Sequence, residues 1–261
     1  MQVLALGTKA TGLVERVVVV AGRGLEGDRH AQLGSPRQVL LVGEQVLQDF
    51  QLPPGALGEN LLLSGDLGEF ASGQLWQVGP AVCLRLMFRC EPCRWLNRLQ
   101  PDLARRIGPR RGWLASVMTG GEVRRGDRLA RSPGQGPGLS DRPRERFAEF
   151  VARIPSGRVV RTPALLLALG VSPAYSRVLP SYLQRADPAL PCHRLVRAEG
   201  RLFSRYLPHQ ADCLRAEGVR VAGDRVVDRT RDWEPAWFHA LPMPAAGPGD
   251  PPDSLGRPWS P

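Results

Sequence analysis

The run Ser132-Pro133-Gly134-Gln135-Gly136-Pro137-Gly138-Leu139-Ser140 divides the chain. Glycine and proline at this density cannot support a helix or an interior strand. The chain has 261 residues, and because domains typically have roughly 100 to 200 residues, two are expected. We therefore predict a first domain at 1–131, a linker at 132–141, a second domain at 142–230 and a Pro-rich, disordered tail at 231–261.

The composition favours a polyanionic partner. Lys and Arg total 35 against 25 Asp and Glu, and the net charge of +10 attracts polyanions such as nucleic acid. Lys9 is the only lysine, so phosphate-loop or Schiff-base chemistry has a single candidate. No stretch approaches the roughly 20 apolar residues that span a bilayer, and the five cysteines are too scattered for a secreted disulfide framework. We expect a cytoplasmic protein with no membrane partner.

Short apolar runs divided by glycine and proline fill the first domain. Their length and spacing are typical of an all-β barrel or sandwich, with helices at 43–50 and at 94–106, where Trp95, Leu99 and Leu103 form an apolar stripe. The glycines at 22–27 imitate a dinucleotide-binding fingerprint, but residues 28–36 are too few for a crossover helix. We interpret them as a loop that needs unusual backbone angles. The expected strands are 13–20, 37–42, 60–63, 74–78, 82–88 and 123–129.

Several ordered motifs make this first part resemble a MOSC domain, the module related to the C-terminus of molybdenum cofactor sulfurases. The motifs are Gly27-Asp28-Arg29-His30, Arg37-Gln38-Val39, Gly58-Glu59-Asn60-Leu61, Pro92-Cys93 and Val123-Arg124-Arg125-Gly126-Asp127. The resemblance implies that Cys93 carries sulfur or ligates molybdenum. It further implies a cleft for the molybdenum cofactor and pyridoxal phosphate-associated sulfur transfer from a cysteine desulfurase partner. Thiolates suit soft metals, and arginines suit the phosphate of a pterin cofactor. The implied cleft residues are Asp28, Arg37, Glu59 and Asn60.

Cys90-Glu91-Pro92-Cys93 also has the CxxC spacing. A zinc site would need a second ligand pair, for which only Cys83 and His30 remain. A redox dithiol is a further alternative, because a neighbouring thiol can resolve a sulfenic acid or persulfide. A β domain with two incidental thiols is the structural alternative.

Beyond the linker, the apolar positions follow a helical period. Phe147, Phe150 and Val151 predict a helix over 142–154 with one buried stripe. Thr162-Pro163 predicts a capped helix that ends at Gly170, and a short turn leads into another helix at 174–185. Two helices joined in this way suit nucleic-acid docking. The basic residues that favour DNA contact are Arg158, Arg161, Arg177 and Arg185.

Pro191-Cys192-His193-Arg194 carries the candidate chemistry of the second domain. A thiol with the ordinary pKa of about 8.5 is mostly protonated at neutral pH. His193 must therefore draw the proton from Cys192 before the sulfur can attack carbon, and Glu217 can orient His193. The alternative is a small buried core thiol, because free cysteine is among the most buried residue types.

Residues 142–230 resemble alkylguanine-DNA alkyltransferases and their non-catalytic alkyltransferase-like relatives. The matching pieces are Ile154-Pro155-Ser156-Gly157-Arg158-Val159, Ser176-Arg177-Val178, Pro191-Cys192-His193-Arg194-Leu195-Val196, Gly200 and Glu217-Gly218. The resemblance implies a mainly α, winged-helix domain on double-stranded DNA, in which Arg177 fills the gap left by a flipped modified guanine. Cys192 would accept the alkyl group, and Thr162, which stands where catalytic members carry a tyrosine, would contact DNA together with Arg194. The non-catalytic relatives generally replace the cysteine with tryptophan, whereas this chain keeps the thiol.

Three functions stay open on this basis. The first is an enzyme that transfers an alkyl group from guanine to Cys192 once per molecule. The second is a non-enzymatic lesion-binding module that signals through a repair-protein partner. The third is a sulfur or molybdenum enzyme that acts through Cys93 on N-hydroxylated compounds.

Overall fold

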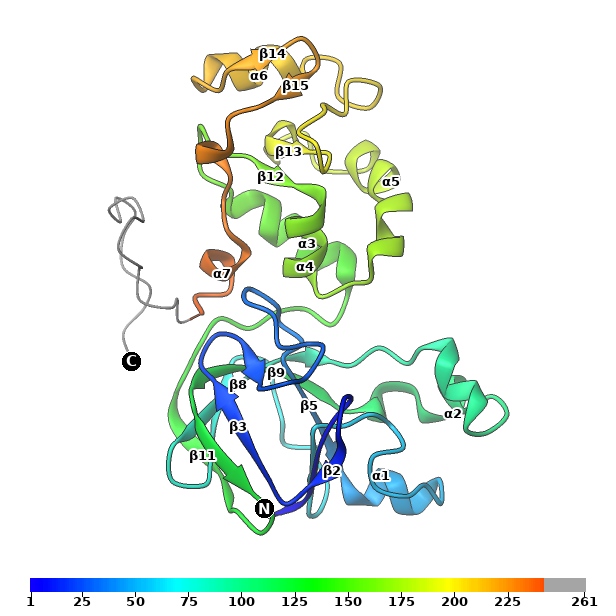
Figure 1. Cartoon of the computed structure of the whole chain (residues 1–261). Helices are drawn as coiled ribbons and strands as arrows, with labels where there is room; N and C mark the ends of the chain where they lie inside the picture. The colour runs from blue at the N-terminus through cyan, green and yellow to red at the C-terminus, as the bar shows by residue number, and fades with distance from the viewer. Residues whose placement is uncertain (242–261) are drawn as a thin grey trace. The chain divides into compact units, whose positions relative to one another are not determined.

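The computed structural model describes residues 1–241, which divide into two compact units. One unit consists of Met1–Asp141 together with Ala240 and Leu241, and the other is Arg142–His239 (Figure 1). No helix within the described part of the chain is long and apolar enough to cross a membrane. The part of the predicted tail at 242–261 lies outside the described residues.

The first unit is mostly β, as the sequence predicts. An eight-stranded sheet has the order β11-β7-β8-β9-β5-β6-β1-β2, and a three-stranded sheet has the order β10-β3-β4. Within the larger sheet only β5 and β6 run parallel. The strands are β1 (Val3–Thr8), β2 (Gly12–Val14), β3 (Arg16–Val20), β4 (Gly24–Leu25), β5 (Val39–Gly43), β6 (Leu61–Leu63), β7 (Gln74–Val78), β8 (Val82–Arg89), β9 (Trp113–Thr119), β10 (Gly121–Arg124) and β11 (Leu129–Gln135).

The burial of each strand follows its place in the sheets. Central strand β5 is buried at every position, which explains its unbroken apolar run. Strand β3 instead alternates, because Val17 and Val19 lie in the core while Val18 and Val20 are exposed. The glycine-rich loop after β3 has positive φ at Gly22, Gly24 and Gly27, as predicted.

The helix predicted at 94–106 is broken. The observed elements are the 3-10 turn η1 (Arg94–Arg98) and helix α2 (Leu103–Ile107), after α1 (Glu44–Asp49) and before η2 (Gly108–Arg111). Pro101 disfavours helical geometry at Gln100, and Asp102 adopts φ 54°. Of the predicted stripe, Leu103 is buried, but Trp95 is 45% exposed, and Leu96 and Ile107 are buried in its place.

The predicted linker is partly a strand. β11 continues through Ser132–Gln135, and Gln135 pairs with Gln74 of β7. The amide of Leu139 then donates to Oγ of Ser72 at 2.7 Å, and the Leu139 side chain is buried. Because β11 lies at the edge of the sheet, its proline and glycine residues do not interrupt the hydrogen bonds between the central strands.

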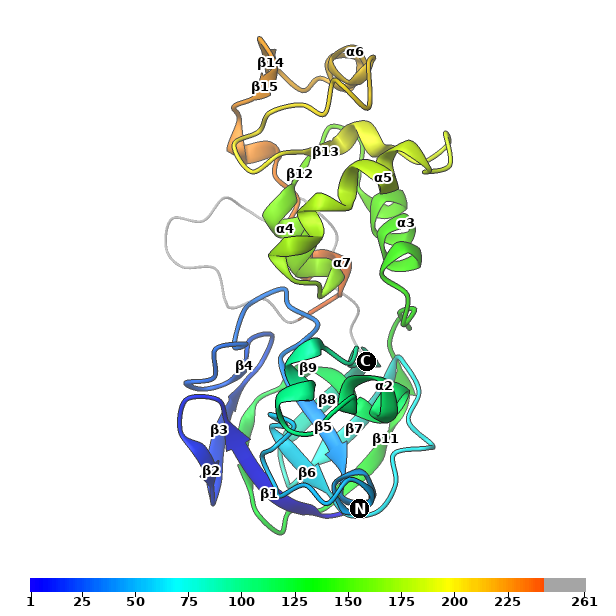
Figure 2. The same ribbon diagram turned by 90° about the vertical axis from the view of Figure 1, so that its right-hand side faces the viewer.

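The second unit consists mainly of helices around two short strand pairs. Figure 2 shows α3, α4 and α5 gathered near the parallel pair β12–β13, and β14 and β15 form an antiparallel pair. The elements are α3 (Pro143–Arg153), β12 (Val160–Arg161), α4 (Thr162–Leu169), η3 (Pro173–Arg177), α5 (Leu179–Gln184), η4 (Cys192–Arg194), β13 (Leu195–Val196), α6 (Gln210–Ala216), β14 (Val221–Ala222), β15 (Arg225–Val226), η5 (Arg229–Arg231) and α7 (Pro235–Phe238).

Two local predictions in this unit need correction. The helix expected at 174–185 is split into η3 and α5, because Pro180 cannot donate within a continuous helix and instead begins a new one. Thr162 does not cap α4, because its hydroxyl donates to the carbonyl of Val196 at 3.1 Å and Arg161 is the N-cap residue. Gly170, with φ 64°, ends α4 as predicted.

The predicted start of the tail, at residue 231, lies too early in the chain. Trp233 and Phe238 are buried, and their rings lie 5.3 Å and 4.8 Å from the ring of Phe150 in α3. Aromatic pairs at these distances add to the free energy of burial. Residues 231–239 therefore belong to the second unit, and Trp233 and Phe238 lie in its core.

Candidate functional site

A cavity of about 250 Å³ opens beside η4 in the second unit. Its volume lies just below the range of sites for drug-sized ligands, roughly 300 to 1,000 Å³, so it suits one compact ring system. The wall is largely apolar, and Cys192 and His193 lie in it together. The lining residues are Leu183, Ala186, Asp187, Pro188, Leu190, Cys192, His193, Tyr206, Leu207, Pro208, His209, Gln210 and Cys213.

Cys192 lies in the cavity wall with its residue only 5% exposed. Burial raises the pKa of its thiol to about 11, because the low-dielectric surroundings disfavour the thiolate. At neutral pH the sulfur is therefore held as the neutral thiol, and a base must remove its proton before it can act as a nucleophile.

His193 is bound to Glu217, as the sequence predicts. The distance from Nε2 of His193 to the Glu217 carboxylate is 2.8 Å. Burial raises the pKa of Glu217, but hydrogen bonds from Arg194, the Gly157 amide and His193 outweigh it and lower the pKa to about 2. An ionised carboxylate only accepts hydrogen bonds, so Nε2 carries the proton and Nδ1 is the basic nitrogen of the imidazole.

Arg194, which follows His193 in η4, also binds the Glu217 carboxylate. Its Nη2 donates to the carboxylate at 2.6 Å and its Nε donates at 3.0 Å, while Nη1 donates to the carbonyl of Ile154. The guanidinium is thus used inside the protein, and this arrangement does not fit the DNA contact that the sequence suggested for Arg194.

Gln210 is a site residue that sequence reasoning missed. It is 1% exposed, and its amide donates to the carbonyls of His193 at 3.0 Å and Leu195 at 2.6 Å. These bonds fix the backbone on both sides of Arg194. A glutamine at a helix start gave no signal, because its partners are backbone atoms distant in sequence.

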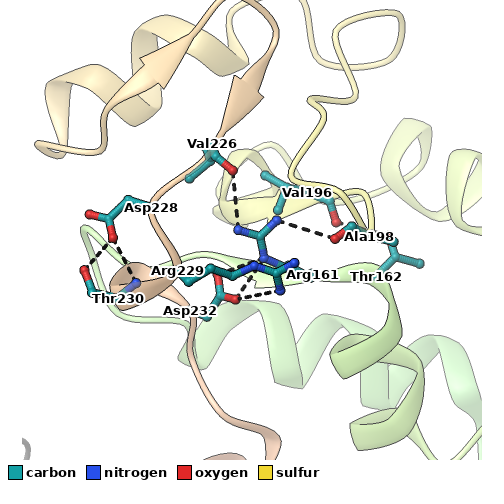
Figure 3. A network of polar contacts seen from close by, with 9 residues as sticks. All are labelled: Arg161, Thr162, Val196, Ala198, Val226, Asp228, Arg229, Thr230 and Asp232. Carbon is teal, nitrogen blue, oxygen red and sulfur yellow. Dashed lines mark hydrogen bonds and ion pairs between the residues drawn. The ribbon is translucent and has the colours of Figure 1, made fainter. Parts of the chain in front are cut away.

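Arg161 also has a role inside the protein. Figure 3 shows its guanidinium between Asp232 and the carbonyls of Ala198 and Val226. Nε donates to Asp232 at 2.8 Å, and the Arg161 residue is 6% exposed. The expected DNA contact of Arg161 therefore does not fit its position, and the same holds for Thr162, whose hydroxyl is bound to Val196.

The remaining basic candidates lie nearer to solvent. Arg177 ends η3 and Arg185 follows α5, and both are exposed. Arg158 is partly exposed and donates to the carbonyl of Thr230 at 2.8 Å. Arg177 makes no hydrogen bond or ion pair within residues 1–241, so its charge is available to a ligand.

In the first unit, three of the predicted cleft residues are buried close together. Asp28 accepts hydrogen bonds from the amides of Lys9 at 3.0 Å and His30 at 2.8 Å and from the Asn60 side chain at 3.2 Å. Burial alone would raise the pKa of Asp28, but these hydrogen bonds have the larger effect, and the pKa is lowered. Neighbouring Glu59 accepts from the amide of Gly55 at 2.6 Å.

Basic groups lie close to Asp28. Nζ of Lys9 lies 2.7 Å from Nε2 of His30, and burial, followed by the charge of Lys9, lowers the pKa of His30 to about 4. His30 is therefore neutral and accepts from Lys9. Burial lowers the pKa of Lys9, and the positive charges of Arg29, Arg111 and Arg37 lower it as well.

Two buried polar groups here are incompletely used. Arg111 is 6% exposed and donates to the carbonyl of Leu57, yet its Nε and Nη1 have no partner among the described residues. The same is true of Oε2 of Glu59 within residues 1–241. Unpaired buried donors are costly, so Nε and Nη1 of Arg111 fit an anionic group such as a phosphate. Arg111 was not singled out from the sequence, because its neighbours come from distant segments.

Cys93 lies at the start of η1 and is exposed, whereas Cys90 is buried. Nη2 of Arg37 is 3.9 Å from Sγ of Cys90, which links the basic cluster to the CxxC segment. Among the described residues, no group of three His, Cys, Asp or Glu side chains can hold a metal ion.

Comparison with known protein families confirms both resemblances. Residues 26–130 match the family model of the MOSC domain, and residues 142–219 match the model of the 6-O-methylguanine DNA methyltransferase, DNA binding domain. The chain thus joins a MOSC domain to an alkyltransferase-like DNA-binding domain.

Several solved structures are similar to parts of the chain. YiiM from Escherichia coli is 16% identical, with 87% of this chain and 98% of that chain covered and a TM-score of 0.42. The YUAD protein from Bacillus subtilis is 22% identical, with 49% and 93% covered and a TM-score of 0.41. S. pombe Atl1 in complex with damaged DNA containing O6-carboxymethylguanine is 22% identical, with 37% and 98% covered and a TM-score of 0.33. No curated protein matches the chain.

Proposed function

We propose that the second unit recognises alkylated guanine in double-stranded DNA and that Cys192 accepts the alkyl group once per molecule. One observation carries the proposal: Cys192 lines a cavity of about 250 Å³ beside His193, whose imidazole is bound to ionised Glu217. The match of residues 142–219 to the methyltransferase DNA-binding family supports DNA as the partner.

The transfer step follows from the proton positions. Nδ1 of His193 takes the proton of Cys192, and Glu217 stabilises the imidazolium that forms. The sulfur then attacks the alkyl carbon, the bond from that carbon to the guanine oxygen breaks, and the guanine takes up the proton. The products are a thioether on Cys192 and an unmodified base, and no further reactant is needed.

The base must leave the duplex to reach Cys192, because the guanine oxygen is buried in the stack. We propose that α4, η3 and α5 dock on DNA as a helix-turn-helix, with β14 and β15 as the wing. Exposed Arg177 would then fill the gap left by the flipped base, and Arg185 and Arg158 would contact phosphates. The internal contacts of Arg161, Thr162 and Arg194 would stabilise the domain, and these three residues would not bind DNA.

The non-enzymatic lesion-binding module is the second candidate, and a specific observation favours it. Burial raises the pKa of Cys192 to about 11, so only about one molecule in 10,000 would carry a thiolate at pH 7 without help from His193. Such a thiol would leave lesion recognition intact, and a repair-protein partner would act on the bound complex.

For the first unit we propose an anionic-cofactor site of the MOSC type, formed as part of a β barrel. Arg37, Arg111 and Lys9 would hold the phosphate of a molybdenum cofactor, and Cys93 would supply the thiolate that carries sulfur from a cysteine desulfurase or ligates molybdenum. The cofactor, when bound, would supply two-electron redox chemistry for N-hydroxylated compounds. Molybdenum and persulfide analysis of the purified chain tests this, with Cys93→Ala as the control, and the absence of both would refute it.

Intact-protein mass spectrometry tests the alkyl transfer. The chain is incubated with duplex DNA that contains O6-methylguanine, and a single methyl adduct is expected on Cys192. Cys192→Ser should abolish the adduct, whereas Cys213→Ser, at the other thiol in the cavity wall, should retain it. DNA binding without any adduct on the wild-type chain would leave the lesion-binding module as the function.

A further inference from the structure

Lys9, the only lysine of the chain, lies in the turn between β1 and β2. Lys9 as a residue is exposed, so a solute can reach its amine. The buried carboxylate of Asp28 accepts hydrogen bonds from the backbone amides of Lys9 at 3.0 Å and His30 at 2.8 Å. This carboxylate thus holds the two residues together, and Nζ of Lys9 lies 2.7 Å from Nε2 of His30.

The surroundings of Lys9 favour its neutral amine. Partial burial and then the charge of Arg29 lower the pKa of Lys9, as do other arginines nearby, and together they outweigh the charge of Asp28. A lysine that is desolvated or lies next to other cations is a stronger nucleophile at neutral pH, because more of it is unprotonated. Neutral His30 accepts an N–H of this amine and leaves the nitrogen lone pair available to an electrophilic carbon.

A buried cation contacts the same loop as Lys9. A Cβ at Gly58 would lie 3.3 Å from Cε of Lys9, and Nη2 of Arg111 donates to the carbonyl of the preceding residue, Leu57. Arg111 is 6% exposed, and its Nε and Nη1 have no partner among the described residues. A guanidinium pairs with two oxygens of a phosphate at once. A phosphate ester would therefore supply the acceptors that Arg111 lacks.

We propose that Lys9 binds a small phosphorylated aldehyde as an imine, with the phosphate held by Arg111. The nitrogen lone pair of Lys9 forms a bond to the aldehyde carbon, and the π pair of the carbonyl moves to its oxygen. That oxygen takes up the two protons that the nitrogen loses and leaves as water. The products are an imine and water, and the step needs no oxidant or reductant. His30 is a positioning residue, because it orients the amine through their hydrogen bond.

This function goes beyond the anionic-cofactor site proposed above, although both use Arg111. A cofactor phosphate needs only positive charge at position 9, which Lys9→Arg preserves, whereas an imine needs the amine, which the always protonated guanidinium does not provide. Cys93 takes no part in the imine, so Cys93→Ala removes the sulfur or molybdenum chemistry and retains the imine. The two proposals can therefore fail separately.

Borohydride trapping on the full chain, with pyridoxal 5′-phosphate as the probe, tests the proposal. Peptide mapping should find a reduced adduct on Lys9, and Lys9→Arg should abolish it. The double variant Lys9→Arg/Arg131→Lys is the matched control, because it moves the only lysine to an exposed position on the edge strand β11. The adduct at position 131 should form about tenfold more slowly, because no phosphate contact holds the aldehyde near the amine there.

The phosphate contact is tested separately. Pyridoxal without the phosphate should label Lys9 about tenfold more slowly than the phosphate ester, because it lacks the charge-assisted hydrogen bonds. Arg111→Met should remove this difference. Inorganic phosphate should slow trapping of the ester on the wild-type chain, which keeps the test valid if Arg111→Met does not fold. Equal trapping rates at positions 9 and 131, or equal rates for the two aldehydes on the wild-type chain, would overturn the proposal.

Discussion

Replacing Glu217 with glutamine should destabilise the second unit strongly. The carboxylate joins the end of α6 to η4 through His193 and Arg194 and to the turn after α3 through the Gly157 amide. The pKa of Glu217 is lowered from 4.5 to about 2, which corresponds to about 3 kcal/mol of folding free energy at about 1.4 kcal/mol per pKa unit. Glutamine keeps one acceptor but leaves Arg194, whose side chain is 16% exposed, without a counter-charge.

The loss should depend on pH in a defined direction. Because the folded pKa lies below the unfolded value, Glu217 contributes its full stabilisation above pH 4.5 and loses it as the pH falls toward 2. The difference between wild type and Glu217→Gln should therefore be constant near neutral pH and shrink between pH 4.5 and 2.

Urea unfolding, followed by the fluorescence of the second unit, measures this difference. The expected loss of about 3 kcal/mol corresponds to a decrease in melting temperature of roughly 10 °C or more for a domain of this size. Glu149→Gln is the matched control, because Glu149 and Arg153 form a partly exposed pair in α3 that should contribute less than about 1 kcal/mol. Equal effects of the two substitutions would refute the role of Glu217 as the link between these elements.

Three further outcomes are expected. Arg161→Met should cost about 3 kcal/mol of stability in urea unfolding, because it leaves the Asp232 carboxylate without its buried partner; a loss below 1 kcal/mol would contradict this. Iodoacetamide should label exposed Cys213 long before buried Cys192, and peptide mapping that finds the reverse order would contradict the burial of the Cys192 thiol. Arg177→Ala should weaken binding to lesion-containing duplex DNA in anisotropy without changing the unfolding midpoint, because Arg177 is exposed and has no partner within residues 1–241.

The sequence predicted those strands and helices that have a clear local pattern. The strands at 74–78 and 82–88 and the helix that ends at Gly170 appear close to the predicted positions. Each has a strong apolar pattern and a clear glycine or proline signal at its ends. The pairing of His193 with Glu217 was also predictable, because both belong to motifs of one family.

The failures share a different physical cause. The stretch at 132–135 was expected to be linker, but an edge strand tolerates proline and glycine when the neighbouring strand supplies the order. Trp233 and Phe238 were placed in a disordered tail, because the ring of Phe150 that they contact lies far away in sequence. In both cases contact with a distant segment supplied the free energy that stabilises the folded conformation. No local sequence pattern encodes such a contact.

The arginines illustrate this limit most directly. Arg161 and Arg177 are both basic residues in the same helical region, and the sequence assigned both to DNA. The structure separates them by their surroundings: Arg161 meets Asp232 and two carbonyls in the protein interior, whereas Arg177 ends a 3-10 turn in solvent. A buried guanidinium has already exchanged its hydration for protein acceptors, and moving it to a phosphate would break its ion pair with Asp232. Charge alone therefore predicts attraction to DNA, while the acceptors around each guanidinium decide which arginine can reach it.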